Sequence, residues 1–146
     1  MRLNIDCVRD VILWAEHLTS PTRKAIYVNT DIVKELAFMY AAENELPSPS
    51  AEQLELLNKY TNEQLVYHIR YCLDAKLLRE ATGSTAEIIA IDDLTPQGHE
   101  FIANIRSDTV FNKTKSVLKK LGIESLQGAV QIAASVTTEI IKASIF

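Results

Sequence analysis

Apolar residues recur at intervals of three and four along most of the chain, which is the spacing of one face of an α-helix. The clearest case is 62–75, which follows the capping-box pair Thr61 and Gln64. Gly122 stands where a helix would end. We expect helices at about 6–18, 31–44, 50–58, 62–75, 96–121 and 126–143.

Polar residues mark most of these helix starts. Asp6 is a plausible N-cap, Ser50 and Gln53 repeat the capping-box spacing, and Thr95 precedes a proline at the first helical position. Thr30 can cap the helix at 31–44. That helix would bury Ile32, Leu36, Met39 and Tyr40.

Short β-prone runs interrupt the helical pattern. Ile26–Val28 is one such run. Two apolar runs, 77–81 and 87–91, enclose a loop that contains Gly83, which predicts a β-hairpin. The fold class is therefore mainly α with a small β-hairpin, an α+β protein.

The order of capped helix, short exit, hairpin and second capped helix is that of a winged helix-turn-helix core, here followed by long C-terminal helices. The segment Val66–Leu78 resembles the recognition helix and exit of small winged-helix regulators, and Leu94–Gly98 resembles their Leu-Thr-x-x-Gly motif. Lys76 stands where such proteins usually have Gly, at a position that often needs positive φ.

A longer resemblance is carried by three further segments, Leu3–Asp10, Tyr60–His68 and Leu94–Val110. They are similar to motifs of an uncharacterised family of phage, prophage and bacterial proteins, known as a domain of unknown function. The resemblance spans most of the chain except about 20–50, which looks like an insertion. It implies the fold and a mobile-element setting, and it brings no established activity.

These patterns predict one globular unit made of two segments. Residues 1–121 form a winged-helix-like domain with the insertion at about 20–50, and 122–146 form a C-terminal packing or dimerisation helix. The final helix is apolar over much of its circumference, so it must be buried on its own core or on a second copy. We expect a homodimer, because twofold pairing is the commonest oligomer. Close approach of another helix is allowed by Ala133, Ala134, Ser135 and Ala143.

Charge changes the picture for DNA binding. The net charge is −4, and residues 1–58 carry five Lys or Arg against nine Asp or Glu. A strong nucleic-acid binder usually has a basic stripe. Cys7 and Cys72 fit buried reduced thiols, and no apolar run is long enough to span a bilayer. We expect a cytoplasmic protein without membrane contact.

An enzyme is not expected. His17, His68 and His99 have no carboxylate or Cys at metal-ligand spacing, and Asp92-Asp93 reads as a solvated turn. There is no Gly-rich phosphate loop and no nucleophile elbow. We therefore predict no catalytic residue, no metal site and no cofactor.

Two functions stay open at this point. The first is a DNA-binding regulator linked to a phage or other mobile element, because Asn and Gln can read adenine and Arg can read guanine. The second is a non-enzymatic adaptor or inhibitor that binds a host or phage protein, which the acidic 1–58 and 83–107 segments favour. Glu63 would repel phosphate. The candidate contacts to double-stranded DNA are Asn62, Gln64, Tyr67, His68, Arg70, Tyr71, Arg79, Lys113 and Lys120.

Overall fold

The structure is a computed structural model of the chain and describes residues 1–40 and 46–145. Most of this part is helical, with one small antiparallel sheet, so the predicted α+β class is confirmed. The elements in chain order are α1 (Ile5–Leu18), β1 (Ala25–Val28), α2 (Thr30–Tyr40), α3 (Ala51–Leu57), α4 (Asn62–Asp74), β2 (Leu78–Glu80), β3 (Ile88–Leu94), α5 (Pro96–Ile105), α6 (Asp108–Leu121) and α7 (Leu126–Ile145).

Helix starts follow the predicted caps in most places. The side-chain oxygens of Ser50, Thr61 and Thr95 each accept a backbone N–H from the residue three positions later. Asp6 and Thr30 are exceptions. Asn4 caps α1 and Asp6 lies in its first turn, whereas Thr30 is the first residue of α2 and the Ile32 N–H donates to Asn29 Oδ1 at 3.4 Å. Asn4 wins because its side chain reaches the Cys7 N–H from an extended backbone, as an N-cap must.

The single helix predicted over 96–121 is wrong. Two helices, α5 and α6, replace it, and Ser107 lies between them in extended conformation. The Ser107 hydroxyl accepts the Val110 N–H at 3.3 Å and so caps α6. The apolar stripe could not reveal this break, because buried residues at helical spacing continue on both sides of it.

The three strands pair in the order β1–β3–β2. β1 runs antiparallel to β3 with Tyr27 opposite Ile89, and β2 runs antiparallel to β3 with Leu78 opposite Leu94. A register shift between Arg79 and Glu80 bends the hairpin. The predicted strand at Ile26–Val28 thus joins the predicted hairpin in one sheet.

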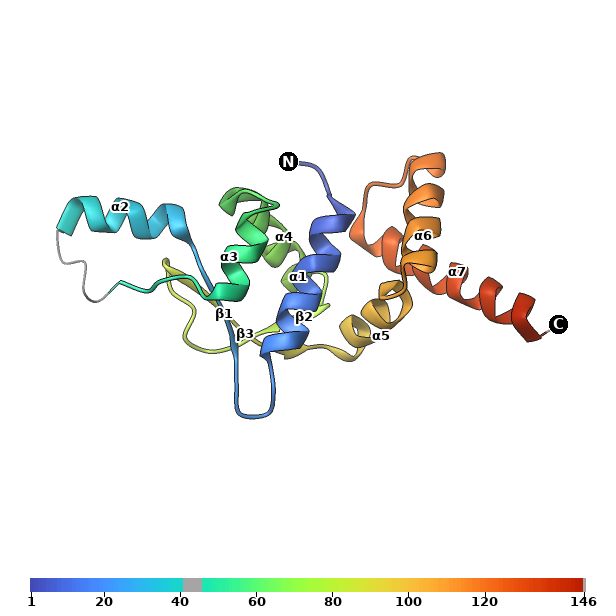
Figure 1. The fold of residues 1–146 in the computed structure, drawn as a ribbon, viewed down its shortest axis with the longest axis horizontal. Helices are drawn as coiled ribbons and strands as arrows, with labels where there is room; N and C mark the ends of the chain where they lie inside the picture. Colours follow the sequence, from blue (N-terminus) through green and yellow to red (C-terminus); the bar gives the residue numbers. More distant parts are fainter. Residues whose placement is uncertain (41–45, 146) are drawn as a thin grey trace.

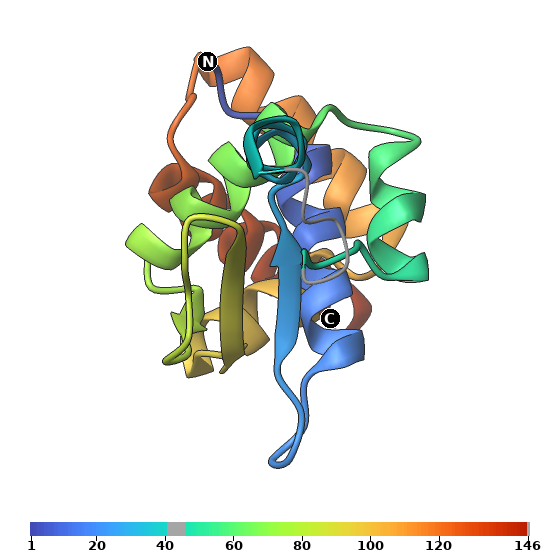
Figure 2. The ribbon, with the colours of Figure 1, turned by 90° about the vertical axis from the view of Figure 1, so that its left-hand side faces the viewer.

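Helix α1 lies at the centre of the fold, where it packs against α3, α4, α5 and β3. Beyond it, α7 packs on α5 and α6. Figure 1 shows the resulting elongated shape, with α2 projecting at one end and the last turns of α7 at the other; Figure 2, viewed from the α2 end, separates α3 from the hairpin and α4. The buried set includes Cys7 and Cys72, both free thiols as predicted.

Helix α2 corrects one part of the sequence prediction. Met39 was expected to be buried, yet it is 68% exposed, and its neighbour Phe38 is 92% exposed. The far end of α2 extends beyond the body, so no core lies beneath these side chains (Figure 1). Residues 41–44 of the predicted helix, and the side chain of Tyr40, lie outside what the structure describes. No helix in the described ranges has the length and apolar character needed to cross a membrane.

Candidate interaction surface on α4

The amino end of α4 is fixed by the side chain of Asn62, which is 9% exposed. Its Oδ1 accepts the Tyr27 hydroxyl at 2.8 Å and the Thr30 N–H at 3.2 Å. Its Nδ2 donates to Asn29 Oδ1 at 2.9 Å and to Asp31 Oδ2 at 3.0 Å. Asn62 therefore connects α4 to the end of β1 and the start of α2, and its amide is not available on the surface for reading a base.

His68 lies inside the fold, between α4 and the start of α1. Its Nε2 accepts the Asn4 backbone N–H at 2.9 Å, so Nδ1 carries the proton and donates to the Gln64 carbonyl oxygen at 2.7 Å. Burial lowers the pKa of this imidazole, and the neutral ring fits both contacts. His68 is thus a second predicted DNA contact that the structure places in the interior.

The outer face of α4 carries the remaining candidates. Tyr67 and Tyr71 are half-buried and meet edge to face, with ring centres 5.9 Å apart. Arg70 is exposed between them. Gln64 is half-buried, and its Oε1 accepts the Thr61 N–H at 2.9 Å, which completes the predicted capping box. The structure thus gathers Tyr67, Arg70 and Tyr71 on one face and engages Gln64 in the cap.

This outer face is hollowed by two adjoining grooves. One, of about 530 Å³, lies between α4 and the start of α2, and the other, of about 430 Å³, continues it toward the carboxyl end of α4. The two grooves share Tyr67 and Arg70. Their other lining residues are Met1, Asn29, Asp31, Ile32, Asn62, Glu63, Val66, Tyr71 and Asp74.

The charge of this face is acidic. Arg70 is the one Arg or Lys among the lining side chains, whereas Asp31, Glu63 and Asp74 supply three carboxylates. The walls between these charges are apolar or aromatic, as at Ile32. The face can therefore hold an apolar segment with positive flanks better than it can hold a phosphate backbone.

The hairpin does not offset this acidity. Arg79 was predicted to contact DNA. Its Nε lies 3.1 Å from Asp92 Oδ2, so its guanidinium forms an ion pair within the sheet. Asp93 and Glu87 add further carboxylates on the same hairpin. Arg79 is thus part of a mixed surface rather than an extension of a basic one.

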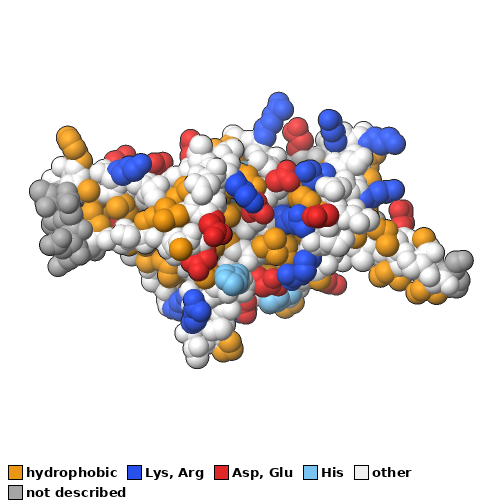
Figure 3. Space-filling model, viewed as in Figure 1, with side chains coloured by type: hydrophobic (Ala, Val, Ile, Leu, Met, Phe, Trp, Pro, Cys, Tyr) orange, Lys and Arg blue, Asp and Glu red, His pale blue; other side chains and the backbone are white. Residues whose placement is uncertain are grey.

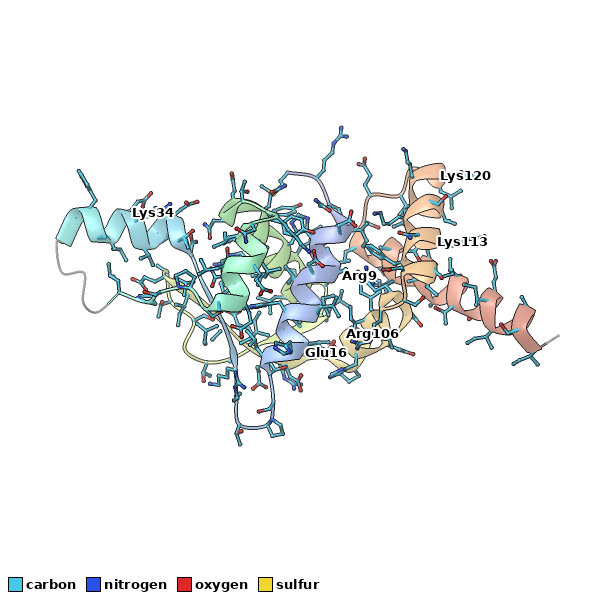
Figure 4. The ribbon with its side chains drawn as sticks, in the orientation of Figure 1. Arg9, Glu16, Lys34, Arg106, Lys113 and Lys120 are labelled. Carbon is cyan, nitrogen blue, oxygen red and sulfur yellow. The ribbon has the colours of Figure 1, made fainter. Side chains whose placement is uncertain are left out.

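Lys113 and Lys120 belong to a different part of the molecule. Both are exposed on α6, which packs against α5 and α7, whereas α4 packs against α1, α3 and β2 (Figure 4). Figure 3 shows Lys and Arg side chains over α6 with Asp and Glu side chains close beside them. One such pair is Lys115 with Asp6, 2.9 Å apart. Lys113 and Lys120, which were predicted as DNA contacts, therefore do not lie on the same surface as the outer face of α4.

At the exit from α4, Lys76 occupies the position where glycine is usual in winged-helix regulators. Lys76 has φ of 61°, in the left-handed region, although it is not glycine. The Thr95 N–H donates to the Leu77 carbonyl oxygen at 3.1 Å. A Cβ on Gly98 would overlap that same carbonyl oxygen. The Leu-Thr-x-x-Gly motif therefore has a physical role: it packs α5 directly on this exit.

Helix α2 and the amino-terminal residues also contribute to the grooves, which no pattern in the sequence indicated. Met1 and Ile32 line the larger groove because Asn62 and His68 hold their segments against α4. No local sequence signal could have placed them there, since both links join residues more than 30 positions apart. Within the described residues, no group of three His, Cys, Asp or Glu side chains is arranged to hold a metal ion.

A family model described as "Hypothetical protein (DUF2513)" matches residues 2–124. The chain belongs to this family. The DUF2513 match covers α1 to α6 and ends just before α7. It confirms the predicted relationship to an uncharacterised family.

One relative from the comparisons is an uncharacterized protein of Haemophilus influenzae. It is 28% identical to this chain over 85 residues, which is 56% of this chain and 72% of that protein. No solved structure matches the chain.

Proposed function

We propose that this DUF2513 protein is a non-enzymatic binding module that recognises another protein through the outer face of α4. The observation that carries the proposal is the cluster of Tyr67, Arg70 and Tyr71 in a hollowed surface. Tyrosine and arginine, together with tryptophan, are enriched where protein interfaces concentrate their binding energy. They combine large apolar area with directional polar groups.

A winged-helix scaffold is the second part of the proposal. The described order of α1, β1, α4, β2 and β3, with an antiparallel sheet ordered β1–β3–β2, supports it. On this scaffold α4 corresponds to the recognition helix and β2–β3 to the wing. The mobile-element setting implied by the sequence fits a module that acts on a protein of a host or of a phage.

The partner's chemistry follows from the charges around Arg70. Asp31, Glu63 and Asp74 favour a partner segment with basic residues at the rim and apolar residues at the centre. Arg70 would meet a carbonyl or carboxylate of that segment. Removal of Arg70 or Tyr67 should cost about 2 kcal/mol of binding, roughly a thirtyfold loss of affinity.

Site-specific photo-crosslinking tests this proposal. A photoreactive amino acid is placed at position 67 and, as a matched control, at exposed Asn112 on α6. Position 67 should capture a defined protein from bacterial lysate that position 112 does not. The purified partner should then bind Arg70→Ala about thirtyfold more weakly than wild type, and Asn112→Ala equally well. Equal capture at both positions, or unchanged affinity of Arg70→Ala, would contradict the proposal.

DNA binding is the second candidate, because α4 precedes the hairpin as a recognition helix does and exposes Arg70 on its outer face. Fluorescence polarisation with genomic DNA fragments across a salt series tests it. A DNA-binding regulator should bind at about 50 mM salt with an affinity that falls steeply as salt rises. Arg70→Ala should weaken that binding. Absence of binding at low salt would remove this candidate and leave the protein partner.

A further inference from the structure

Helix α7 has two halves with different surroundings. In the first half Leu126, Ala129, Ala133 and Val136 are buried against the body. After Val136 the helix continues away from the body (Figure 1). The predicted burial on the protein's own core therefore holds for the first half alone. An exposed apolar stripe begins near the end of the first half and runs along the second half.

The stripe consists of Ala134, Thr138, Ile141 and Ile145, all of them exposed. They are spaced by four, three and four residues, which is the repeat of a helix seam that packs on another helix. Ile141 is 51% exposed and Ile145 is 69% exposed. Covering these two side chains would remove large aliphatic surface from water, which is favourable.

Two exposed hydroxyls along the helix, those of Thr138 and Ser144, are satisfied within it, whereas the buried Thr137 hydroxyl has no hydrogen-bond partner among the described residues. The Thr138 hydroxyl donates to the Ala134 carbonyl oxygen at 2.9 Å, and the Ser144 hydroxyl donates to the Ile140 carbonyl oxygen at 2.9 Å. Burying the stripe would therefore leave neither hydroxyl without a partner. Thr138 presents its methyl group and behaves as a small apolar residue in the stripe.

Side-chain size changes along the stripe in one direction. The small Ala134 and Thr138 are nearest the body, and the large Ile141 and Ile145 are at the far end. Two copies that run antiparallel would place Ala134 opposite Ile145 and Thr138 opposite Ile141. Each layer then combines one small and one large side chain, which fills space evenly. A parallel pair would place Ile145 against Ile145 and leave a gap at Ala134.

From the complementary sizes along the stripe and its satisfied hydroxyls we propose that α7 binds a second copy of this chain, antiparallel, through Ala134, Thr138, Ile141 and Ile145. This pairing does not depend on what α4 binds. A stripe of about three helical turns buries less surface than the roughly 800 Å² per partner that a standard interface buries. The dimer is therefore expected to dissociate in the micromolar range, and it gives the assembly two α4 surfaces related by a twofold axis.

Sedimentation equilibrium of the full chain tests the dimer between about 10 and about 500 µM protein. The average mass of wild type should rise from that of a monomer toward that of a dimer. Ile141→Glu should stay monomeric, whereas Ala143→Glu, an exposed change on another side of the same helix, should dimerise like wild type. Circular dichroism should be the same for all three. A wild type that remains monomeric at every concentration overturns the proposal.

Disulfide trapping tests the direction of pairing. Ala134→Cys and Ile145→Cys are prepared separately and mixed under mild oxidation, in a background whose native thiols are buried. Antiparallel pairing should yield the mixed 134–145 disulfide as the main product. Ile145→Cys linked to itself as the main product would indicate parallel pairing and would overturn the proposed register.

Discussion

The two ends of α4 are held in different ways. At the amino end a single side chain, Asn62, makes four hydrogen bonds to residues 27–31, which span the end of β1 and the start of α2. At the carboxyl end the backbone itself is the connector, with Lys76 left-handed and Gly98 packed on the Leu77 carbonyl. The amino end therefore depends on a hydrogen-bond network in which every partner of Asn62 is needed. The carboxyl end depends on Gly98 having no side chain, because a Cβ there would overlap the Leu77 carbonyl.

Gly98→Ala should have the largest effect, because a Cβ would overlap the backbone oxygen of Leu77 and force α5 away from the exit. We expect a loss of about 3–5 kcal/mol in the free energy of unfolding, measured by urea denaturation. Gln97→Ala, at the exposed neighbouring position, should change that free energy by less than about 0.5 kcal/mol. A loss below about 1 kcal/mol for Gly98→Ala would mean that the exit adjusts easily.

Asn62→Ala tests how much the hydrogen bonds of Asn62 stabilise the amino end of α4. It leaves the Tyr27 hydroxyl and the Thr30 N–H without their acceptor, so unfolding should become easier by about 2–4 kcal/mol in the same assay. Glu63→Ala, one exposed position further along, is the matched control and should be nearly neutral. If the two substitutions had equal effects, the amino end of α4 would be held by its cap rather than by Asn62.

Acid is expected to lower the free energy of unfolding by a smaller amount, through protonation of His68 in the unfolded chain. Its pKa is lowered in the folded protein by burial, so the unfolded chain binds more protons in mildly acidic solution. Stability should be full above the unfolded value near 6.5 and should fall as pH drops from there toward the folded pKa. His68→Gln should flatten this part of the pH profile, whereas His17→Gln, at an exposed position, should leave it in place. An unchanged profile in His68→Gln would assign the acid sensitivity to another group.

Lys76→Gly should have the smallest effect and the opposite sign. Glycine adopts positive φ without the cost that lysine carries, so the free energy of unfolding should rise by up to about 1 kcal/mol. Ala75→Gly, one position earlier with φ of −79°, should lower it by about 0.5–1 kcal/mol. Destabilisation by both glycines would show that the Lys76 side chain has a stabilising role of its own.

Local signals explain what could be predicted from sequence. The capping box of Thr61 and Gln64, the hairpin and the positive φ of Lys76 all depend on residues a few positions apart. The inward placement of Asn62 and His68 depends on partners at Tyr27 and Asn4, far along the chain. A helical pattern assigns such polar residues to the outer face, and so both were expected to face DNA.

Gln53 is another polar residue whose partner lies too far along the chain to be predicted from local spacing. Ser50 caps α3 as predicted, but the Gln53 side chain does not complete a box. It instead exchanges two hydrogen bonds with the backbone of Val28, at 2.9 and 2.7 Å, and is fully buried. A buried amide satisfied by a strand gains more than an exposed one at a helix end, and no spacing rule identifies that strand beforehand.

The sheet order has a consequence for the route by which the chain folds. Leu77 and Thr95 are joined across 18 positions, whereas Ala25 and Ile91, which pair in β1 and β3, are 66 apart. Closing a longer loop costs about 0.6 kcal/mol more for each doubling of its length. The α4–β2–β3–α5 segment should therefore assemble early and serve as a template on which β1 docks last. Until then β3 has an open edge, so substitutions that slow the docking of β1 should favour aggregation during refolding rather than change the finished surface.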